Sequence, residues 1–561
     1  MCGIFCNIYR DNVQVKCYHQ LLKNRGPDAF NVTEISLDDN WKGSFAGSTL
    51  WTQGLNIKSQ PLIHPNGSIL LWNGDKYSDL NASSNFKNNI TENDSEEVLY
   101  NLVNGNISYF EQITGPYAFI FYNSEKNELW FGRDVLGRHS LLWHVSQKSI
   151  ILSSVAEPKS CNILKEVPSC GIFKISLTTC DISIDLFPWS HMIPKEITSD
   201  VPFFVKDLLY HNILGKSTDY YWTIMKPSEN ESALLNFAEG PEVVFPQFLE
   251  IPYYLNTVNK LKDLLFKSVK RRVITKPDFC KDCLLKNIDC KHAKIGILFS
   301  GGLDSAIIAL ITDNFVPEDE PIDLFNVSFA RDQEQKYDIV PDRKTGKRTL
   351  QELRLLCPKR CWNFVEINVT QEELKDERHK HIINLIYPLS SILDDSLGCA
   401  IWFAARGKGL LNEKLYTSPT RVVLLGMGAD EMFGGYSRHR ATFRNHGWKG
   451  VTRDLYNDLR HIGERNLGRD NRVVADHGRQ PRMPYLDEEF VASVDSLPTW
   501  FRCCLDPKLA RGVGDKLLLR LLAWNLGLRS AASLPKKALQ FGSHIANPRD
   551  KGHATSKNLM T

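Results

Sequence analysis

Buried-type strands alternate with helix-type segments through the second half of the chain, and this alternation constrains the fold most. Apolar runs predict an apolar helix over Ser305–Thr312 and strands at Ile295–Phe299, Asp323–Phe329, Phe364–Val369 and Val422–Leu425. Strands that are apolar on both faces and separated by helices form parallel sheets, because each crossover helix covers a face of the sheet. The sequence therefore predicts a parallel-sheet α/β domain over residues 249–546.

Residues 1–185 contain short β-type runs separated by turn residues. Examples are Ala118–Tyr122, Leu129–Phe131 and Ser149–Ser153, and helix-type stretches are few. Closely spaced short strands indicate antiparallel sheets, so we expect stacked sheets with some helical cover (α+β). Residues 186–248 show no clear period and are interpreted as an interdomain connection, and residues 547–561 as a polar, frayed tail.

Composition excludes several classes of protein. Lys and Arg number 68 and Asp and Glu 65, and a net charge of +3 is too small for a protein that coats duplex nucleic acid. No apolar run reaches the roughly 18 residues of a membrane-spanning helix, and the first residues lack the basic region of a signal peptide. Fourteen Cys in 561 residues are too few for a disulfide scaffold. We expect a cytoplasmic protein that acts on small molecules, with no nucleic-acid or membrane partner.

Cys2 occupies a position with special chemistry. Removal of Met1 would expose an α-amino group with a pKa of about 8, which can act as the base for the thiol of the same residue. The run Trp72–Asp75 ends an apolar strand, and an Asn side-chain amide and a Gly backbone N–H are suitable donors to a tetrahedral oxyanion. The pair Asn73-Gly74 is equally suited to a hairpin turn, so both interpretations stay open for these residues alone.

Six short motifs occur in order in the first half of the chain: Met-Cys-Gly-Ile at its start, Arg25–Asp28, Gln60–Leu62, Trp72–Asp75, Asp94–Glu96 and Phe131–Arg138. Together they resemble the class II glutamine amidotransferase domain, an N-terminal nucleophile (Ntn) fold. The resemblance implies an antiparallel sheet sandwich with helices, and hydrolysis of the glutamine side-chain amide through a thioester on Cys2. It also implies an oxyanion hole of Asn73 and Gly74, and a glutamine-binding set of Leu50, Asn73, Asp75 and Asp94.

Two residues depart from this family pattern. Asp75 stands where the family has a Glu, which is one methylene longer, and Thr49 stands where the family has the Arg that would bind the glutamine carboxylate. Loss of a bidentate Arg partner should cost about 1.5–3 kcal/mol of glutamine binding. We therefore expect either weak use of glutamine or a different cation in place of the Arg.

Two glycine-rich loops follow predicted strands in the second half. Ser300–Ser305 follows the first strand, and Gly426–Asp430 follows the fourth. Glycines let the backbone approach an anion, and a helix N-terminus offers free N–H groups. Loops at the carboxyl edge of a parallel sheet form nucleotide sites, although a plain βα turn is the alternative for the first loop. Asp304 and Asp430 would repel each other, so their pairing favours a Mg²⁺ ion between them.

These loops, together with Arg482–Asp487, Lys516–Arg520 and Lys536–Gly542, resemble the pyrophosphate-loop domain (adenine nucleotide alpha hydrolase-like) of glutamine-dependent asparagine synthetases, and within that family the asparagine synthetase domain-containing subgroup. The resemblance implies a carbon–nitrogen ligase that adenylates a carboxylate (aspartate in the family) with Mg-ATP and transfers ammonia to it; a homodimer is left open. The nucleotide-binding residues it implies are Phe299, Ser300, Gly301, Gly302, Asp304, Ser305, Val327 and Gly426. The metal ligands it implies are Asp304 and Asp430, and the catalytic lysine is Lys537, with Lys536 as the alternative.

Met427 stands where asparagine synthetases carry a Glu beside the acyl-adenylate. A thioether cannot accept a proton, coordinate Mg²⁺ or bind an ammonium group. Two alternatives to asparagine synthesis therefore stay open: amidation of a different carboxylate, and a protein that binds nucleotide or glutamine without synthesis.

A Cys and His cluster precedes the first strand of the second domain, in the spacing Cys280-x2-Cys283-x6-Cys290-x-His292. Three thiolates and one imidazole suit a tetrahedral Zn²⁺ ion. Because the spacing is irregular, solvent-facing free thiols are the alternative.

Overall fold

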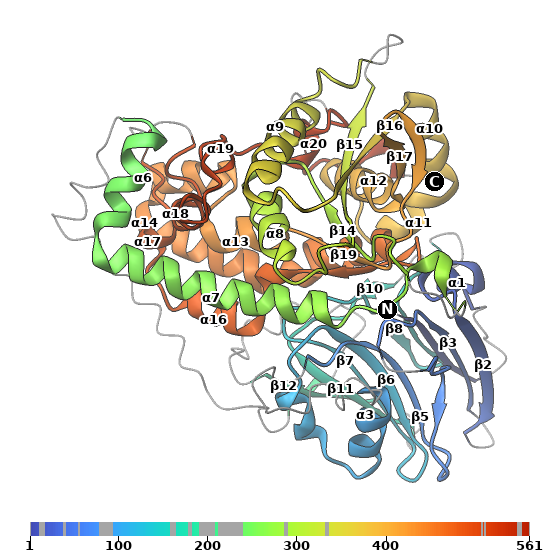
Figure 1. Ribbon diagram of the computed structural model, residues 1–561. Helices are drawn as coiled ribbons and strands as arrows, with labels where there is room; N and C mark the ends of the chain where they lie inside the picture. Colours follow the sequence, from blue (N-terminus) through green and yellow to red (C-terminus); the bar gives the residue numbers. More distant parts are fainter. Residues whose placement is uncertain are drawn as a thin grey trace.

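The structure is a computed structural model of the chain. It describes residues 2–10, 17–37, 41–53, 56–77, 94–157, 164–177, 182–189, 208–210, 239–284, 286, 290–330, 336–506, 509, 512–546 and 552–559. Within these ranges, antiparallel sheets form the N-terminal half, and a mainly parallel sheet with helices on its faces forms the C-terminal half (Figure 1). Both predicted fold classes are confirmed.

The N-terminal half is a sandwich of antiparallel sheets around an apolar core. One sheet has the strand order β10 (Lys165–Glu166), β8 (Leu142–Ser146), β9 (Ser149–Ser153), β1 (Gly3–Tyr9), β3 (Lys42–Thr49), β2 (Ala29–Ser36). The other has the order β13 (Leu208–Tyr210), β12 (Ile184–Pro188), β11 (Gly171–Ser176), β7 (Glu128–Arg133), β6 (Tyr117–Asn123), β5 (Ile69–Gly74), β4 (Leu62–Ile63), with β13 parallel to β12. Apolar side chains of both sheets, such as Ile4 in β1 and Phe119 in β6, share one core.

β1 is buried on both of its faces. Ile4, Cys6 and Ile8 pack into the core of the sandwich, whereas Phe5 points to the opposite face and joins a second core, formed mainly by the C-terminal half. Successive side chains of a strand point to opposite faces, so this alternation follows from the strand itself. The first sheet is therefore enclosed between the second sheet and the C-terminal half. Cys2 consequently lies at the boundary of the two halves, where Figure 1 marks the N-terminus.

The C-terminal sheet has the strand order β18 (Lys414–Thr417), β17 (Lys408–Leu411), β16 (Trp362–Val369), β15 (Ile322–Phe329), β14 (Ile295–Leu298), β19 (Val422–Leu424), β20 (Gln480–Arg482). The five neighbouring strands β16, β15, β14, β19 and β20 are parallel to one another. At the edge of the sheet, β17 and β18 form an antiparallel hairpin. From β14 the chain builds outward to β15 and β16, and later returns to the other side of β14 with β19. The strand order thus reverses beside β14, and in open α/β sheets the crevice at such a point binds ligands.

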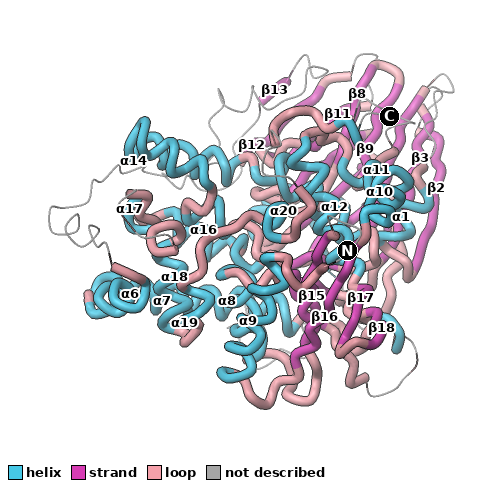
Figure 2. The backbone as a smooth tube through the Cα atoms, turned by 90° about the horizontal axis from the view of Figure 1, so that it is seen from above, coloured by secondary structure: helices cyan, strands magenta, loops and turns pink. Residues whose placement is uncertain are grey.

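Helices cover both faces of this sheet. In Figures 1 and 2, α8 and α9 lie together beside the sheet, and Figure 1 shows α12 on its other side. The described helices of the chain are α1 (His19–Arg25), α3 (Asp94–Val103), α6 (Pro241–Glu250), α7 (Pro252–Ile274), α8 (Leu303–Asp313), α9 (Pro341–Leu356), α10 (Gln371–Glu377), α11 (Ile383–Ile386), α12 (Ile392–Arg406), α13 (Ala429–Phe433), α14 (Ser437–Arg460), α15 (Gly468–Ala475), α16 (Glu488–Asp495), α17 (Thr499–Arg502), α18 (Leu517–Asn525), α19 (Arg529–Ala532) and α20 (Leu539–Gly542). None of the helices in the described ranges is long and apolar enough to cross a membrane.

The limits of the two halves differ from the predicted boundaries. α6 begins at Pro241, ahead of the predicted residue 249, because Val244, Phe245 and Phe248 are buried in the core of the C-terminal half. On the other side, β12 crosses residue 185, and β13 extends the second sheet into the expected connection. Residues 190–207 and 211–238 of that connection lie outside the described residues.

The predicted frayed tail is packed over its described part. Residues 552–559 lie against the N-terminal end of α12, where Thr555 pairs with Ser391 in a β-bridge. Ser556 is buried, and its hydroxyl donates to Asp395 at 2.8 Å. A polar sequence is held here because α12 presents a buried carboxylate that requires donors.

Candidate active sites

The side chain of Asn73 binds the backbone nitrogen of the predicted nucleophile, Cys2, and also carries a hydrogen-bond donor without a partner among the described residues. The backbone N–H of Cys2 donates to Asn73 Oδ1 at 2.9 Å, and Asn73 is fully buried at the end of β5. Its Nδ2 has no hydrogen-bond partner among the described residues. Leaving a buried donor unsatisfied costs about 1–3 kcal/mol, so this N–H group is available to an oxygen atom of a ligand. The sequence-predicted Cys2, Asn73 and Gly74 are thus brought together.

The environment of the Cys2 thiol favours its protonated form. Burial raises its pKa, whereas the positive charge of the N-terminus and a backbone hydrogen bond from Leu50 lower it, and the carboxylates of Asp94 and Asp75 add to the increase. A buried, protonated thiol needs a base before it can act as a nucleophile. The backbone nitrogen of Cys2 would become that base once Met1 is removed.

Asp94 and Asp75 form an acidic pair near the thiol. Asp94 accepts hydrogen bonds from the Trp72 indole and from the Lys76 backbone N–H, both at 3.2 Å. Burial raises the pKa of Asp94 to about 7, and the charge of Asp75 contributes to the same shift. Two interacting carboxylates favour a cation between them, as the predicted recognition of an α-ammonium group requires.

Asp75 is held by two glutamines that the sequence motifs did not single out. Gln53 donates to its Oδ1 at 2.7 Å, and Gln480 donates to its Oδ2. The guanidinium of Arg482 lies 4.0 Å from the same Oδ2. Gln480 and Arg482 belong to β20 of the C-terminal sheet, so this carboxylate is shared between the halves. Gln53 and Gln480 carry no local pattern that could have indicated this role.

Thr49 does not supply the missing cation. It is buried, and its hydroxyl donates to the carbonyl of Lys58 at 3.0 Å. A guanidinium does lie beside the nucleophile, since Arg25 Nε is 3.5 Å from the carbonyl oxygen of Cys2. Burial and, to a smaller extent, the charge of Arg472 lower the pKa of Arg25 to about 9. Arg25 is therefore a candidate for the different cation that the sequence predicts.

The loop after β14 has the backbone of an anion-binding turn. Gly301 has φ +76°, and a Cβ there would lie 2.5 Å from the backbone of Gly346 in α9, so only glycine fits. Gly302 donates to the Ser300 hydroxyl at 3.2 Å, and the Ser305 hydroxyl donates to the Gly302 carbonyl at 3.2 Å. Phe299 directly follows β14, Val327 lies within β15 near its carboxyl end, and Gly426 follows β19, and these strands are neighbours in the sheet.

Two lysines neutralise the two carboxylates of this region. Lys516 Nζ lies 2.7 Å from Asp304 Oδ2 and 2.7 Å from Asp430 Oδ1, and Lys536 Nζ pairs with Asp430. The pairing of the carboxylates therefore does not by itself require a metal ion, because ammonium groups already balance their charge. Burial alone would raise the pKa of Asp430, but Lys516 and Lys536 lower it below its ordinary value.

The donor set nevertheless fits a hard cation. Asp304 Oδ1 is buried and accepts no hydrogen bond from the described residues, so a carboxylate oxygen is left for a ligand. Carboxylate oxygens combined with substrate phosphates are the ligands that Mg²⁺ prefers. Asp304 and Asp430 would hold the ion.

Lys536, rather than Lys537, reaches the carboxylates. Lys537 is exposed, whereas the Lys536 ammonium contacts Asp430 and also feels the charge of Asp304. The extra residue before Phe541 lets either side chain precede the aromatic residue, so spacing alone left this choice open.

Lys516 is a functional candidate that the sequence motifs did not assign. It is 1% exposed and adopts φ +55° at the start of α18, a left-handed conformation that costs an L-residue about 1–3 kcal/mol. Its side chain passes Gly435, where a Cβ would lie 2.4 Å from Lys516 Cε and collide with Asp430 Oδ1. Backbone strain of this kind is concentrated at functional sites.

One short segment touches both sites. Gln480 at its start binds Asp75, and Tyr485 donates its hydroxyl to the backbone carbonyl of Asp304 at 3.0 Å. Arg138 of the N-terminal half fastens the end of the segment, donating to the Leu486 carbonyl at 2.9 Å and pairing with Glu488. Residues 480–488, which we call the bridging segment, therefore connect the thiol side of the molecule to the glycine loop.

Met427 lies in the glycine-rich loop that follows β19. It is partly buried and packs against the apolar core of the C-terminal half. The Cys and His cluster lies elsewhere, between α7 and β14, with the ligand atoms of Cys280, Cys283, Cys290 and His292 all within 4.8 Å of one another.

Comparison with known protein families agrees with this geometry. The sequence model of the glutamine amidotransferase domain matches residues 1–168, and that of asparagine synthase matches residues 290–523. The fold and the two sites thus define an ATP-dependent, glutamine-hydrolysing type of amidotransferase.

Sequence identity to individual proteins shows which family within this class the chain belongs to. Asparagine synthetase domain-containing protein 1 of Homo sapiens is 37% identical, over 97% of this chain and 95% of its own length, and that of Gallus gallus is 36% identical over 100% of both chains. A putative glutamine-hydrolysing asparagine synthetase of Methanocaldococcus jannaschii is 23% identical over 86% of this chain and 79% of its own length. The chain belongs to the asparagine synthetase domain-containing protein family, as the sequence motifs predicted.

Proposed function

We propose that this chain hydrolyses glutamine at Cys2 and transfers the ammonia to a carboxylate activated by ATP, with aspartate as the acceptor. The observation that carries the proposal is Asn73, which holds the Cys2 nitrogen with one side-chain atom and leaves a buried N–H donor with the other. A donor placed beside a nucleophile in a buried site is what an oxyanion hole requires.

The glutaminase half uses groups of the N-terminal domain. The α-amino group of Cys2 takes the thiol proton, and sulfur attacks the amide carbon of glutamine while Asn73 and Gly74 donate to the oxyanion. The carbon–nitrogen bond then breaks, and the amino group returns the proton to the leaving ammonia. Water next cleaves the thioester to give glutamate. Asp75 and Asp94 orient the substrate through its α-ammonium group.

The synthetase half uses the glycine loop and the lysines. An oxygen of the acceptor carboxylate attacks the α-phosphorus of ATP, pyrophosphate leaves into the loop of Ser300–Ser305, and ammonia then displaces AMP from the acyl-adenylate. Lys516 and Lys536 are freed from Asp304 and Asp430 to stabilise phosphate charge. Mg²⁺ held by those carboxylates would neutralise the charge of the pyrophosphate.

Ammonia has to travel between the sites without being protonated. The bridging segment supports such a route, because Gln480 contacts Asp75 and Tyr485, five residues further on, contacts the backbone of Asp304. Met483 and Tyr485 within it are buried in the apolar core of the C-terminal half, where water is excluded.

A second candidate function is favoured by Met427. Its side chain is apolar and packs against the core, so it cannot bind an ammonium group. This supports an acceptor that has a carboxylate but lacks the α-ammonium group of aspartate. The glutaminase and adenylation steps would be unchanged. A protein that binds nucleotide without synthesis is the third alternative.

The test uses the purified chain with Mg-ATP, glutamine and aspartate, and follows glutamate, pyrophosphate and asparagine. Formation of all three supports aspartate as the acceptor. Pyrophosphate that depends on a carboxylate other than aspartate supports the second function. ATP binding without pyrophosphate or glutamate would contradict an enzymatic role.

A further inference from the structure

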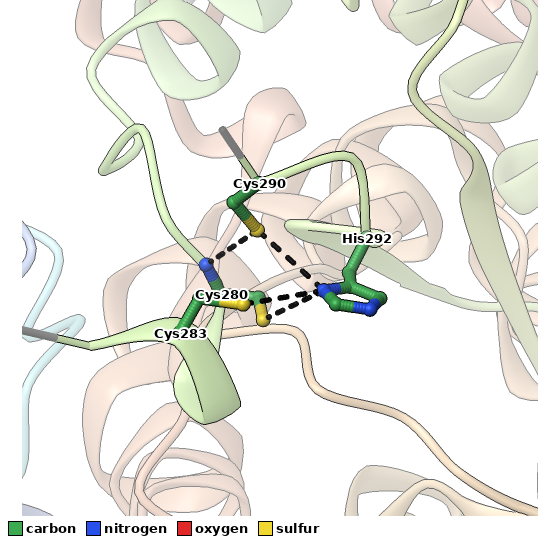
Figure 3. Close-up of side chains that lie close together, drawn as sticks. All are labelled: Cys280, Cys283, Cys290 and His292. Atoms are coloured by element: carbon green, nitrogen blue, oxygen red, sulfur yellow. Dashed lines mark hydrogen bonds between the residues drawn. The ribbon is translucent and has the colours of Figure 1, made fainter. Parts of the chain in front are cut away.

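The Cys and His cluster lies outside both active sites and has unusual geometry (Figure 3). His292 Nδ1 lies 3.6 Å from Cys280 Sγ, 3.3 Å from Cys283 Sγ and 3.8 Å from Cys290 Sγ. The three sulfur atoms thus surround a single ring nitrogen, and the three Cys are buried at 0–5% exposure. The sequence spacing left both a metal site and solvent-facing thiols open, and buried thiols are not solvent-facing.

Hydrogen bonds cannot account for three such contacts. One ring nitrogen carries either one proton or one lone pair, so it can satisfy at most one sulfur atom. A tetrahedral Zn²⁺ ion explains all three. With Zn–S near 2.3 Å and Zn–N near 2.0–2.1 Å, each sulfur should lie about 3.6 Å from the nitrogen, and the three observed distances bracket that value.

We propose that Cys280, Cys283, Cys290 and His292 form a structural Zn²⁺ site. Four protein ligands fill a tetrahedral shell and leave no position for a substrate, which is the pattern of a structural rather than a catalytic ion. The backbone N–H of Cys280 donates to Cys290 Sγ at 3.3 Å, a contact that stabilises a metal-bound thiolate.

The position of the site indicates what it holds in place. Phe279, next to the first ligand, packs on Trp51 of the N-terminal half with ring centroids 4.7 Å apart. Trp51 follows Leu50, whose backbone bonds the Cys2 thiol, and its own N–H donates to Asp28 at 2.7 Å. Asp28 in turn pairs with Arg421 of the C-terminal half. Through Phe279, the segment that carries the zinc ligands therefore contacts the N-terminal half next to the residues that border Cys2. We call the stabilisation of this contact between the two halves the fastening role of the site.

Metal analysis of the purified full-length chain tests the site without any assay of activity. After dialysis against metal-free buffer, mass spectrometry of the elements should find about one zinc ion per chain. The variants Cys283→Ser and His292→Ala should lose it, while Cys361→Ser, at an exposed cysteine outside the cluster, should keep it. Absence of stoichiometric zinc in the wild-type chain, or its retention in Cys283→Ser, would overturn the proposal.

A second measurement covers the case in which a ligand variant fails to fold. Extraction of zinc from the folded wild-type chain by a chelator should release the metal and expose three additional thiols to a thiol reagent. Release of metal without the additional thiols would place the metal elsewhere and contradict the site.

The fastening role has its own readout. Zinc extraction should change the tryptophan emission of the wild-type chain, and this change should be largely lost in Trp51→Phe. A change of full size in Trp51→Phe would contradict the fastening role, because the emission would then report on other tryptophans.

Discussion

Asp75 in the N-terminal half accepts a hydrogen bond from Gln480 in the C-terminal sheet, across 405 positions of the chain. The same carboxylate accepts a second bond from Gln53, within its own half. A group proposed to bind glutamine is thus positioned from both sides of the domain boundary. We therefore expect a change at this carboxylate to affect both sites.

The two glutamine residues should differ in their effect. Gln480→Ala removes the bond from the bridging segment, so we expect glutamate formation to continue while amidation falls, which raises the ratio of glutamate to pyrophosphate. Gln53→Ala is the matched control, since it removes a bond to the same carboxylate without touching the bridging segment. An unchanged ratio in Gln480→Ala would contradict an effect of this carboxylate on both sites.

Cys2→Ala should abolish turnover with glutamine and leave turnover with ammonia intact, because only the first needs the thiol. Asn73→Ala removes an oxyanion donor and should lower glutaminase kcat by about 10²–10³. Cys17→Ala serves as the control. Both rates are measured as AMP released with each nitrogen source, and equal loss of the two in Cys2→Ala would argue against the assignment.

Asp94 should make glutamine binding depend on pH. Its pKa is about 7, raised by burial and by the charge of Asp75. Below pH 7 the carboxyl becomes neutral and no longer attracts an ammonium group, so the KM for glutamine should rise about tenfold for each pH unit. Asp94→Asn should raise KM and remove this dependence. A KM that stays level between pH 5.5 and 8 in the wild-type chain would refute the role.

Lys536 and Lys537 should be separable by substitution. Lys536→Met removes an ammonium that contacts Asp430, and we expect the rate of pyrophosphate formation to fall by about 10²–10³. Lys537→Met changes an exposed side chain and should have little effect. Exchange of labelled pyrophosphate into ATP measures the step directly. The opposite ranking would restore Lys537 as the catalytic lysine.

Met427→Glu tests the choice of acceptor. The new carboxylate would stand where asparagine synthetases carry one, so asparagine formation from aspartate should appear or increase. Met427→Gln, which is similar in length but uncharged, should not have this effect. If Met427→Glu leaves asparagine formation unchanged, the acceptor is decided by other residues.

Local patterns in the sequence were sufficient for the fold class and for much of the candidate sites. The strand at Ile295–Phe299 and the glycine turn after it are decided by nearby residues, because side-chain alternation, apolarity and the freedom of glycine act over a few positions. The family resemblance carried by Trp72–Asp75 implied that Asn73 acts together with Cys2, and the structure adds the hydrogen bond between them and a buried donor on Asn73.

The sequence by itself determined which strands, turns and motifs this chain contains, and the tertiary structure decided how their side chains balance one another. Lys516 lies between Asp304 and Asp430, and Gln480 reaches Asp75, because packing brings together residues that are 86 to 405 positions apart. No periodicity encodes such pairs, since a lone Lys or Gln carries no signal of its distant partner. Their charges and hydrogen bonds are satisfied only once the sheets and helices have packed.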